Sequence, residues 1–534
     1  MICKVDTTSG VVRMIDNAQL YKSQRASLGA SNMVATSQPL AAQAGVNAMH
    51  KGGNAVDAAI ATAITLTVVE PTGNGIGSDA FALVWDGENL TGLNGSGRSP
   101  ALWDPGYFSR YRKMPQFGWD AVTVPGAVSL WSVLSEAYGR LPFESLFEMA
   151  IEYAYRGFQV GFRTAYDWQH GPAEWYKDFD EFGRHFLPPP KVGQRVVRRE
   201  LGETLQELSV HPESLYSGSL AEKIEYQAVK DGGALRVSDL SEHETDWVVP
   251  VTCRYRNTTV HEIPPNGQGL AVLIALGILD TREPGQLDSA DGVHLQIEAM
   301  KIALRAAADH ISDAETMQVS ISDLLDKDSL ARVANDIGIN ASILPPAALP
   351  SSFDTVYLST ADAGGMMVSF IQSNYFGFGS GIVIPQTGIA LQNRGWGFSL
   401  EQGHPNQVAP SKKPFHTIIP GFLTCDGQAM ASFGVMGGPM QAQGHVQMVT
   451  RLVDHKQNPQ AASDAPRWQV LGDYSISVEP SFPEEIVSNL EKRGHKISYA
   501  SDSWSFGGAQ LIIKTDNGYV GGSDHRKEGC VAGF

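Results

Sequence analysis

Thr355 is the residue of this sequence whose surroundings most clearly suggest chemistry. It opens the alternating segment TVYLSTA and follows a connector of small residues and prolines, ASILPPAALPSSFD (341–354). If the chain were cut between Asp354 and Thr355, the new terminus would carry a hydroxyl nucleophile and an α-amine with a pKa of about 8, which can accept the hydroxyl proton. The same hydroxyl could make the cut by attacking the carbonyl of Asp354. The alternative is purely structural, because threonine is β-branched and commonly starts a strand.

Two adjacent glycines, Gly437 and Gly438, form a second candidate group in the segment GVMGGPMQAQGHVQMV. Backbone N–H groups near a helix start can stabilise the oxyanion that forms when a carbonyl is attacked. The structural alternative is a strand-to-helix turn with positive φ angles, which glycine adopts without strain. Both interpretations stay open at this level.

Several familiar functional motifs are absent from the sequence. The glycine-dense segment GNGIGSDA (73–80) lacks the GxGxxG spacing of a dinucleotide site, and there is no Walker A or HExxH motif. The four cysteines show no CxxC or Cys/His metal spacing. A glycosidase carboxylate pair cannot be located among 57 acidic residues. We therefore predict neither a metal ion nor an organic cofactor.

The elements that must position Thr355 are readable from hydrophobic periodicity. Segments 355–361 and 366–373 alternate in hydrophobicity around the turn DAGG, which predicts a β-hairpin. Segment 39–70 predicts two helices broken at KGGN, with Asn54 as an N-cap. Two strands are expected within 248–263 and others at 381–385, 389–393, 422–426 and 430–435, and further helices are expected at 288–337, 445–455 and 484–494. This periodicity fits both an α/β and an α+β layered fold.

The overall composition is that of a large globular protein. The chain has 534 residues, 43% of them hydrophobic, and a formal net charge of −17 with no Lys/Arg run, which argues against nucleic acid or an anionic membrane as partner. The longest apolar block, residues 55–69, carries Asp57 and several threonines and is short for a membrane span. The N-terminus lacks a secretory apolar region. We therefore expect a cytoplasmic protein.

Ordered sequence blocks nevertheless resemble a known family. The blocks are MVATSQPLAAQAG, KGGNAVDAAIATAITLTVVEP, GIGSDAFALVWDG, GRSP, TVYLSTADAGGMMVSFIQS, APSKKPFHTIIPGF, GVMGGPMQ and DAPRW. With them the chain resembles the γ-glutamyltransferase family of N-terminal-nucleophile hydrolases over nearly its whole length. The resemblance implies an α+β fold, a four-layer αββα sandwich that cleaves itself into two chains. Residues 1–354 would form the large chain, with helical outer layers and strands of the sandwich, and residues 355–534 the small one.

The resemblance also implies roles for individual residues. Thr355 falls on the family's nucleophile, and Ser373 on the hydroxyl residue that hydrogen-bonds it. Gly437 and Gly438 fall on the oxyanion-hole glycines. Arg98, in GRSP, falls on the arginine that binds the substrate's α-carboxylate, a task suited to a guanidinium group.

This sequence departs from the family pattern around the expected substrate. Gly397 stands where the transferases have an aspartate that binds the substrate's ammonium group, and Arg394 stands where they have a glutamine. His416 and Thr417 replace paired serines that contact the carboxylate. Tyr375 replaces an asparagine, and Val356 replaces the threonine after the nucleophile. A γ-glutamyl substrate would bring its ammonium beside Arg394 with no acid to meet it, and an unpaired buried charge is costly.

The sequence therefore favours hydrolysis of an amide of a small acid that has a carboxylate and no α-amino group. The segments HTIIP and GGPMQAQGH are most similar to the family branch that contains oxamate amidohydrolase, so oxamate is a candidate substrate. Three alternatives stay open: a γ-glutamyltransferase or glutathione hydrolase, a glutaryl or cephalosporin-type acylase, and a family member without catalytic activity. The expected partners are the amide and the two chains of one precursor, with a homodimer of these heterodimers as a further arrangement.

Overall fold

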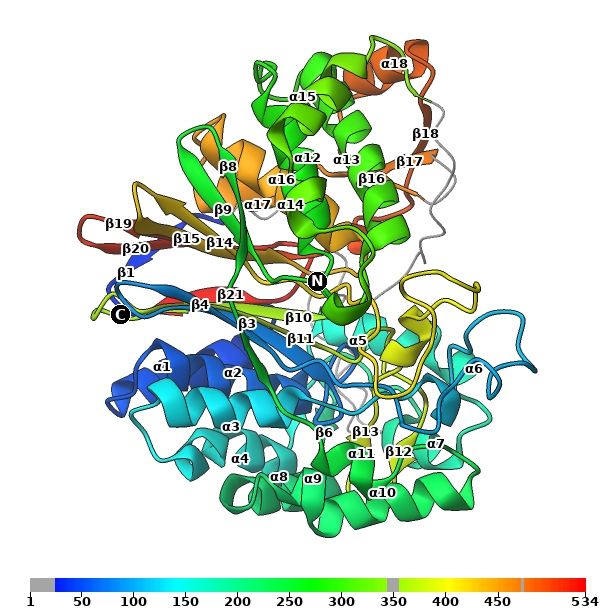
Figure 1. Cartoon of the computed structure of the whole chain (residues 1–534). Helices are drawn as coiled ribbons and strands as arrows, with labels where there is room; N and C mark the ends of the chain where they lie inside the picture. Colours follow the sequence, from blue (N-terminus) through cyan, green and yellow to red (C-terminus); the bar gives the residue numbers. More distant parts are fainter. Residues whose placement is uncertain (1–24, 343–354, 472–474) are drawn as a thin grey trace, which may run out of the picture.

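Four layers stack to form the molecule. The computed structural model describes residues 25–342, 355–471 and 475–534. Within these ranges, two seven-stranded sheets lie face to face, and helices cover the outer face of each (Figure 1). This arrangement confirms the predicted α+β, four-layer αββα architecture and decides the question that periodicity left open.

Each sheet combines strands from distant parts of the sequence, paired antiparallel throughout. The first sheet has the order β1 (Leu28–Ala30), β20 (Gly518–Ser523), β19 (Ala509–Thr515), β15 (Gln428–Val435), β14 (Gly421–Cys425), β9 (Thr258–Glu262), β8 (Val251–Tyr255). The second has the order β21 (Cys530–Gly533), β2 (Met33–Thr36), β10 (Val356–Ala361), β11 (Met367–Ser373), β3 (Asp79–Trp85), β4 (Leu90–Asn94), β7 (Asp246–Val248).

The helices divide into two layers. The layer outside the second sheet contains α1 (Pro39–His50), α2 (Ala55–Val69), α3 (Ala127–Tyr138), α4 (Glu148–Arg156), α8 (Arg199–Val210), α9 (Ser214–Ser217), α10 (Ser219–Lys230) and α11 (Val237–Ser241). The layer outside the first sheet contains α12 (Gly269–Asp280), α13 (Ala290–His310), α14 (Ile321–Leu324), α15 (Lys327–Asp336), α16 (Met440–Val453), α17 (Pro459–Asp464) and α18 (Glu484–Lys492). Three short helices, α5 (Phe162–Gln169), α6 (Pro172–Trp175) and α7 (Asp180–Phe186), lie at one end of the sandwich.

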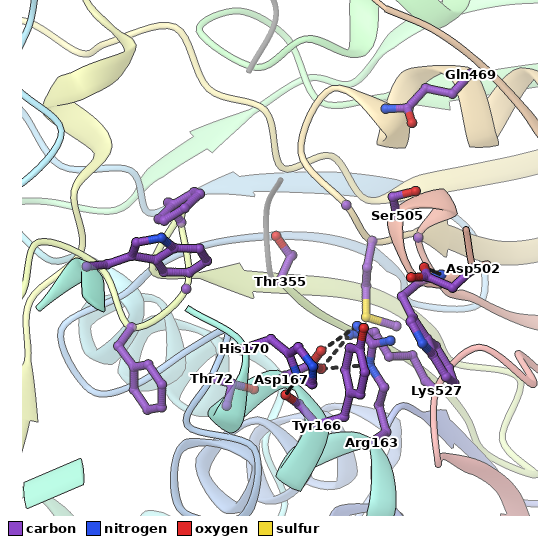
Figure 2. Close-up of a pocket in the computed structure, with 18 residues that line it drawn as sticks. Thr72, Arg163, Tyr166, Asp167, His170, Thr355, Gln469, Asp502, Ser505 and Lys527 are labelled. Atoms are coloured by element: carbon purple, nitrogen blue, oxygen red, sulfur yellow. Dashed lines mark hydrogen bonds and ion pairs between the residues drawn. The ribbon is translucent and has the colours of Figure 1, made fainter. Parts of the chain in front are cut away.

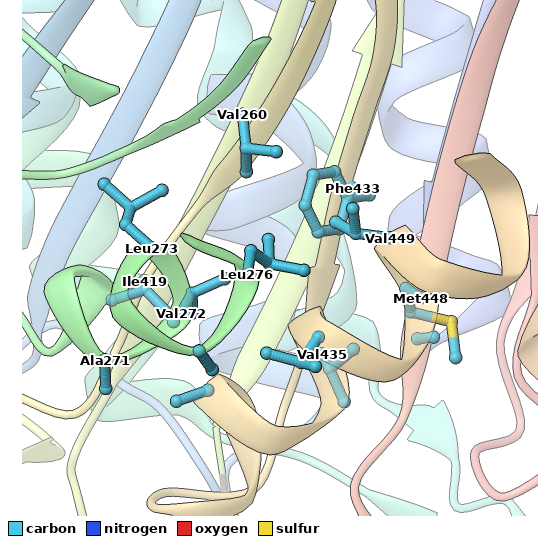
Figure 3. Close-up of a cluster of buried hydrophobic side chains, with 14 of the residues drawn as sticks. Val260, Ala271, Val272, Leu273, Leu276, Ile419, Phe433, Val435, Met448 and Val449 are labelled. Atoms are coloured by element: carbon cyan, nitrogen blue, oxygen red, sulfur yellow. The ribbon is translucent and has the colours of Figure 1, made fainter. Parts of the chain in front are cut away.

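The central strands are apolar on both faces because hydrophobic side chains pack against each face. Figure 3 shows side chains of α12 and α16, such as Leu276 and Val449, packed against Val260 and Phe433 of the first sheet. Val356 and Leu358 of β10 join the separate cluster beneath the second sheet, whereas Tyr357 between them joins the cluster between the sheets. A strand between a helix layer and another sheet buries both sets of alternate side chains.

One glycine lets the two sheets approach each other near the centre. A Cβ atom on Gly434 of β15 would lie 2.3 Å from the ring of Tyr357, so only glycine leaves room for that ring. The Tyr357 hydroxyl then hydrogen-bonds Ser369 at 2.7 Å on the neighbouring strand. The close contact fixes β10, and with it Thr355 just before the strand, against the first sheet.

The helical block predicted at 39–70 is confirmed. Asn54 caps α2 by accepting hydrogen bonds from the N–H groups of Val56 and Asp57, and Asp57 in turn accepts from the N–H of Asn54. This reciprocal capping box ends the KGGN break and starts a helix that is buried along its whole length. No helix in the described residues combines the length and apolar character needed to cross a membrane.

Some sequence-based expectations differ from the structure in detail. Segments 381–385 and 389–393 form only the two-residue strands β12 (Val383–Ile384) and β13 (Ile389–Ala390), which pair with each other outside the sandwich. Two other small sheets join β5 (Phe158–Gln159) to β6 (Arg195–Val196), and β16 (Trp468–Val470), β17 (Ser475–Val478) and β18 (Lys496–Tyr499). Asp354 and most of the connector lie outside the described residues.

Candidate active site

The β10–β11 hairpin brings two hydroxyl groups together. Its register pairs Val356 with Gln372, so Thr355 and Ser373 lie side by side at the open end of the hairpin. Their Oγ atoms are 3.0 Å apart, and both residues are buried. Ser373 Oγ also accepts a hydrogen bond from the Tyr375 N–H at 2.8 Å. Ser373 can therefore direct its own proton at the Thr355 oxygen and orient that hydroxyl.

The chain after β11 adopts a conformation that is unusual for a non-glycine residue. Tyr375 has a φ of +80°, a region that ordinary side chains avoid and that often occurs at functional sites. The preceding residue is held in place: the Asn374 N–H donates to the Gly73 carbonyl at 3.0 Å, and Ser78 donates to the Asn374 side chain at 2.8 Å. These contacts aim the Tyr375 N–H at Ser373.

Gly437 and Gly438 form the turn between β15 and α16. Their φ angles are +115° and +57°, and the N–H groups of Met440 and Gln441 donate to their carbonyls as the helix begins. The Gln268 side chain donates to the Gly438 carbonyl at 2.9 Å. Because its carbonyl is bound in this way, the turn keeps a fixed orientation beside Thr355, as an oxyanion site requires.

A buried hydrogen bond between His445 and Glu262 supports the same turn from behind. His445 of α16 lies 2.7 Å from Glu262 through Nδ1, and its Nε2 accepts from the Val435 N–H at 3.3 Å. Burial raises the pKa of Glu262, and the neighbouring His445 partly opposes that shift. Sequence analysis missed Gln268, His445 and Glu262, since they come from three segments with no shared motif.

Thr355 and Gly437 line one cavity of about 330 Å³, which we call the α5 cavity. Figure 2 shows Thr355 at its centre, with Arg163, Tyr166 and Asp167 of α5 below. Asp502, Ser505 and Lys527 lie on another side. The nucleophile is therefore open to a space large enough for part of a substrate.

A second cavity has a volume of about 450 Å³, and we call it the Tyr375 cavity. Its lining includes Tyr375, Thr417 and Gly397 from the sequence-based hypothesis. The complete described lining is Lys113, Met114, Gln268, Leu304, Ala307, Ala308, Ile311, Tyr375, Trp396, Gly397, Phe398, Asn406, Phe415, Thr417 and Pro439. No acidic side chain occurs in that described lining.

Arg394 lies directly behind two residues of the Tyr375 cavity. Its guanidinium stands 3.8 Å from the centre of the Tyr375 ring, and Nη1 donates to Thr417 Oγ1 at 2.9 Å. The side chain is fully buried, and its Nε and Nη2 have no hydrogen-bond partner among the described residues. Burial lowers the pKa of Arg394 to about 10, so the group stays charged at neutral pH. Two unpaired donors on a buried cation are costly, and an anion can satisfy both.

His416 serves a different partner from the one expected. It is fully buried, and its Nε2 lies 3.0 Å from Asp79, the residue paired with Ser373 across β3 and β11. Its Nδ1 accepts from the Ile418 N–H at 3.4 Å, so the ring proton is on Nε2. Burial, with Arg394 and Lys413 nearby, holds the pKa of His416 well below its usual value. His416 therefore stays neutral and positions Asp79, a residue that sequence analysis missed.

Arg98 lines neither the α5 cavity nor the Tyr375 cavity. Its Nη1 lies 3.1 Å from Asp313 and 3.1 Å from the Ser411 carbonyl, and the side chain is 40% exposed. It lines a separate cavity of about 30 Å³ with residues such as His243 and Lys413. Its predicted contact with a substrate carboxylate stays a prediction.

One group of described residues could offer ligand atoms to a metal ion. His294, Glu298 and His495 place ligand atoms within 4.8 Å of one another. These atoms already have partners: His294 Nδ1 lies 2.8 Å from His495 Nε2, and Lys301 donates to Glu298 at 2.7 Å. A lysine bound to the only carboxylate opposes a second cation there, so the group is better explained as a buried hydrogen-bond network.

We expect Ser373→Ala to slow cleavage of the chain before Thr355 by about twofold to tenfold, the net value of one neutral hydrogen bond. The variant loses the contact that orients the Thr355 hydroxyl. The rate is measured from the appearance of the smaller chain on denaturing gels. Ser432→Ala is the control, because the buried Ser432 hydroxyl has no partner among the described residues. Equal cleavage rates in both variants would contradict this role for Ser373.

Asp79 gives the protein a predictable dependence of stability on pH. Burial raises the pKa of Asp79 to about 7, and Arg394 offsets part of that shift. The folded state thus binds this proton more tightly than the unfolded state. The resulting stabilisation is complete below the free-aspartate value of 3.8 and is lost as the pH rises through 7. The free energy of unfolding should therefore fall between pH 6 and pH 8, and in the Asp79→Asn variant this fall should be smaller by about 1.4 kcal/mol.

This prediction is checked by urea unfolding at the two pH values in a Thr355→Ala background, where the polypeptide remains one chain. Asp86→Asn, at an exposed turn carboxylate, is the control and should leave the pH dependence unchanged. An Asp79→Asn variant that loses as much stability as its background would show that Asp79 does not titrate in this range.

Comparison with known proteins agrees with this geometry. The family model described as Gamma-glutamyltranspeptidase matches residues 41–534. The Glutathione hydrolase-like YwrD proenzyme of Bacillus subtilis (strain 168) is 34% identical over 95% of this chain and 99% of its own length. The Oxamate amidohydrolase proenzyme of Klebsiella pneumoniae is 32% identical over 93% of this chain and 97% of its own length.

A solved structure matches the whole architecture. The cephalosporin acylase of Bacillus halodurans superposes with a TM-score of 0.94, at 44% sequence identity, over 98% of this chain and 99% of that one. The family match covers most of the sequence, and the sandwich and the Thr355–Ser373 pair agree with it. The chain is therefore an enzyme that belongs to the gamma-glutamyltranspeptidase family of N-terminal-nucleophile hydrolases.

Proposed function

We propose that the protein is a self-processing amidohydrolase whose nucleophile is Thr355. In the first reaction, Thr355 Oγ attacks the carbonyl carbon of Asp354, and the peptide nitrogen leaves as the free α-amine of Thr355. Water then hydrolyses the resulting ester and leaves chains 1–354 and 355–534. The contact of Thr355 with Ser373 and the adjacent Gly437 turn support this step, and so do the relatives named as proenzymes.

The mature enzyme would use the same groups on an external amide. The α-amine of Thr355 accepts the hydroxyl proton while Oγ bonds to the amide carbon, and it later returns the proton to the leaving nitrogen. The backbone N–H groups at Gly437 and Gly438 stabilise the oxyanion. Water attacks the acyl-enzyme ester, and the acid leaves.

The charge around the Tyr375 cavity carries our assignment of the acyl group. The described lining has Lys113 and no acidic side chain, and the buried cation of Arg394 adjoins it through Tyr375 and Thr417. A carboxylate in this cavity would lie near the positive charges of Lys113 and Arg394, whereas the described lining offers an α-ammonium no acidic side chain. We infer that the acid has a carboxylate in addition to the reacting carbonyl and lacks an α-amino group.

Gly397 makes this preference difficult to reverse. A Cβ atom at this position would lie 2.9 Å from the Phe415 carbonyl oxygen, closer than real Cβ atoms come to backbone. An aspartate could enter only if the 415 segment moved. The absence of an acid is therefore built into the local backbone, which argues against γ-glutamyl compounds as the preferred substrates.

The size of the cavity bears on the length of the acid. Oxamate is the shortest amide that meets the charge requirement, and one relative is an oxamate amidohydrolase. A volume of about 450 Å³ with lining residues such as Leu304, Ile311 and Phe398 favours a longer dicarboxylic acyl group such as glutaryl. The similarity to a cephalosporin acylase supports that second candidate.

A series of anilides that differ only in the acyl group tests this proposal. Oxalyl, succinyl, glutaryl, pentanoyl and γ-glutamyl anilides are compared by kcat/KM. We expect an acyl group with a terminal carboxylate to be hydrolysed at least about a hundredfold faster than γ-glutamyl, since an unpaired buried charge costs several kcal/mol. Glutaryl should exceed oxalyl if the cavity volume sets the length.

Arg394→Gln separates the role of charge from general damage to the site. The glutaryl-to-pentanoyl ratio of kcat/KM should fall by about tenfold, because the variant loses the buried positive charge behind the cavity wall, which attracts only the carboxylate. Pentanoyl anilide is the internal control, since it fills the same space without charge. Robust γ-glutamyl hydrolysis that a dipeptide acceptor stimulates would overturn the proposal in favour of a transferase.

A further inference from the structure

The α5 cavity and the Tyr375 cavity lie on opposite sides of one wall. In the segment after β11, Tyr375 lines one cavity and Phe376 lines the other. The turn between β15 and α16 shows the same alternation, because Gly437 lines the α5 cavity and Pro439 lines the Tyr375 cavity. Two separate backbone segments therefore stand between the α5 cavity, which Thr355 lines, and the Tyr375 cavity.

A planar amide needs two such compartments. Its acyl and amine substituents are trans, so they leave the attacked carbon in opposite directions. If the acyl half lies in the Tyr375 cavity, as the proposed function states, the amine half must lie in the α5 cavity. Ammonia, the amine half of oxamate, is about as large as a water molecule, which occupies about 30 Å³. A cavity of about 330 Å³ is far larger than ammonia requires.

Arg163 is the group in the α5 cavity that needs a partner. Its Nε and Nη2 hold Asp167, one turn later on α5, at 2.7 and 2.5 Å. Its guanidinium lies 4.3 Å from the ring centre of Trp504 and 5.4 Å from that of Tyr166. The residue is only 7% exposed, and Nη1 has no hydrogen-bond partner among the described residues. A buried donor in a cavity wall that lacks an acceptor favours a ligand oxygen.

The other charged groups near this wall are largely engaged with one another. Lys527 lies 3.7 Å from Asp167 and 4.0 Å from Glu70. Burial raises the pKa of Glu70 to about 7, although Lys527 and Ser37 oppose that shift. Glu528 accepts from Thr164 and from the N–H groups at the start of α5. Asp502 lines the cavity and accepts from the Trp504 N–H at 2.9 Å.

We propose that the α5 cavity binds the amine half of the amide and selects amines that carry a flat apolar group and a carboxylate. The flat group would pack against aromatic lining residues such as Trp175, Phe376 and Trp504. The carboxylate would accept a hydrogen bond from Arg163 Nη1. After cleavage, this half takes the proton from the α-amine of Thr355 and departs as a free amine.

Binding of free amines tests the proposal without turnover. The probes are 4-aminobenzoate and its neutral analogue 4-aminobenzamide, titrated calorimetrically into the purified protein. We expect 4-aminobenzoate to bind about tenfold more tightly than 4-aminobenzamide, the usual gain from one charge-assisted hydrogen bond. Arg163→Gln should reduce that ratio to about one.

Arg305→Gln is the matched control. Arg305 of α13 binds Asp309 four residues later, with an Nε–Oδ2 distance of 2.6 Å, so it repeats the pairing of Arg163 with Asp167 away from the cavity. The tenfold ratio should survive in this variant. If Arg163→Gln fails to fold, Trp504→Leu replaces it and should weaken both probes by the same factor, because the aromatic contact serves both.

Three outcomes would overturn the inference. They are equal binding of the two probes to the wild-type protein, a ratio that Arg163→Gln leaves intact, and a ratio that depends on Arg394 instead. The last result would place the carboxylate in the Tyr375 cavity. These titrations need no hydrolysis. If the enzyme hydrolyses none of the anilides, that result would count against the proposed acyl group, and the binding test of the α5 cavity would still stand.

Discussion

Thr355→Ala should remain one chain of 534 residues and should hydrolyse no anilide of the series. The variant lacks the oxygen that attacks Asp354, so neither the cut nor the release of the α-amine can occur. Loss of a nucleophile costs about 10⁴-fold or more in rate. Intact-mass spectrometry distinguishes the uncut chain from the wild-type pair of 354 and 180 residues. Thr355→Ser keeps the hydroxyl and should still be cut.

Thr360→Ala is the control for the loss of a buried threonine from the same strand. Thr360 Oγ1 donates to the Ala55 carbonyl at 2.6 Å, and Thr360 lies five residues beyond Thr355. That variant should be destabilised by about 1 kcal/mol, the net value of one hydrogen bond, and should still be cleaved. A wild-type protein that stays a single chain after purification, or is cut at another residue, would contradict the role proposed for Thr355.

Gly437→Ala should reduce both self-cleavage and anilide hydrolysis by about 10²–10³-fold, the usual cost of losing an oxyanion donor. The φ of +115° is one that alanine avoids, and an added Cβ would lie 3.2 Å from Gly507 Cα. The turn must therefore rotate, and its N–H groups no longer point at the developing oxyanion. Rates of cleavage and hydrolysis are compared with those of the wild-type protein.

Gly427→Ala provides the matched control. Gly427 has a φ of +75° in the turn between β14 and β15, and a Cβ there would meet nothing within 4 Å. It carries the same kind of backbone strain without contact with the site. If both glycine variants cleave and hydrolyse equally well, the Gly437 turn has no part in stabilising the oxyanion.

Local sequence patterns predicted the hairpin and the glycine turn, and the family resemblance identified Ser373 as the partner of Thr355. The alternating segments around DAGG fix the hairpin register, and this register alone places Thr355 beside Ser373. The glycine pair before a helix likewise predicted the positive φ angles of the β15–α16 turn. In both cases a few neighbouring residues determine the geometry.

Groups that depend on distant segments could not be predicted in this way. Gln268 reaches the Gly438 carbonyl from a separate helix, and Asp79 meets His416 from a strand 337 positions away. Arg163 carries no motif, and the Trp504 ring that lies over its guanidinium comes from a distant segment. Burial, which makes these groups chemically unusual, is a property of the whole fold.

The interleaving of strands from the two chains determines how the cleaved enzyme can unfold and refold. Strand β2 from before the proposed cut lies between β21 and β10 from after it, and β11 likewise borders β3. Two chains joined in this way cannot part unless the hydrogen-bond ladders of a sheet break. Folding must therefore precede the cut, while the precursor is still one molecule. Once the cleaved pair has unfolded, recovery becomes a bimolecular encounter that slows on dilution, so heat inactivation follows the rate of unfolding.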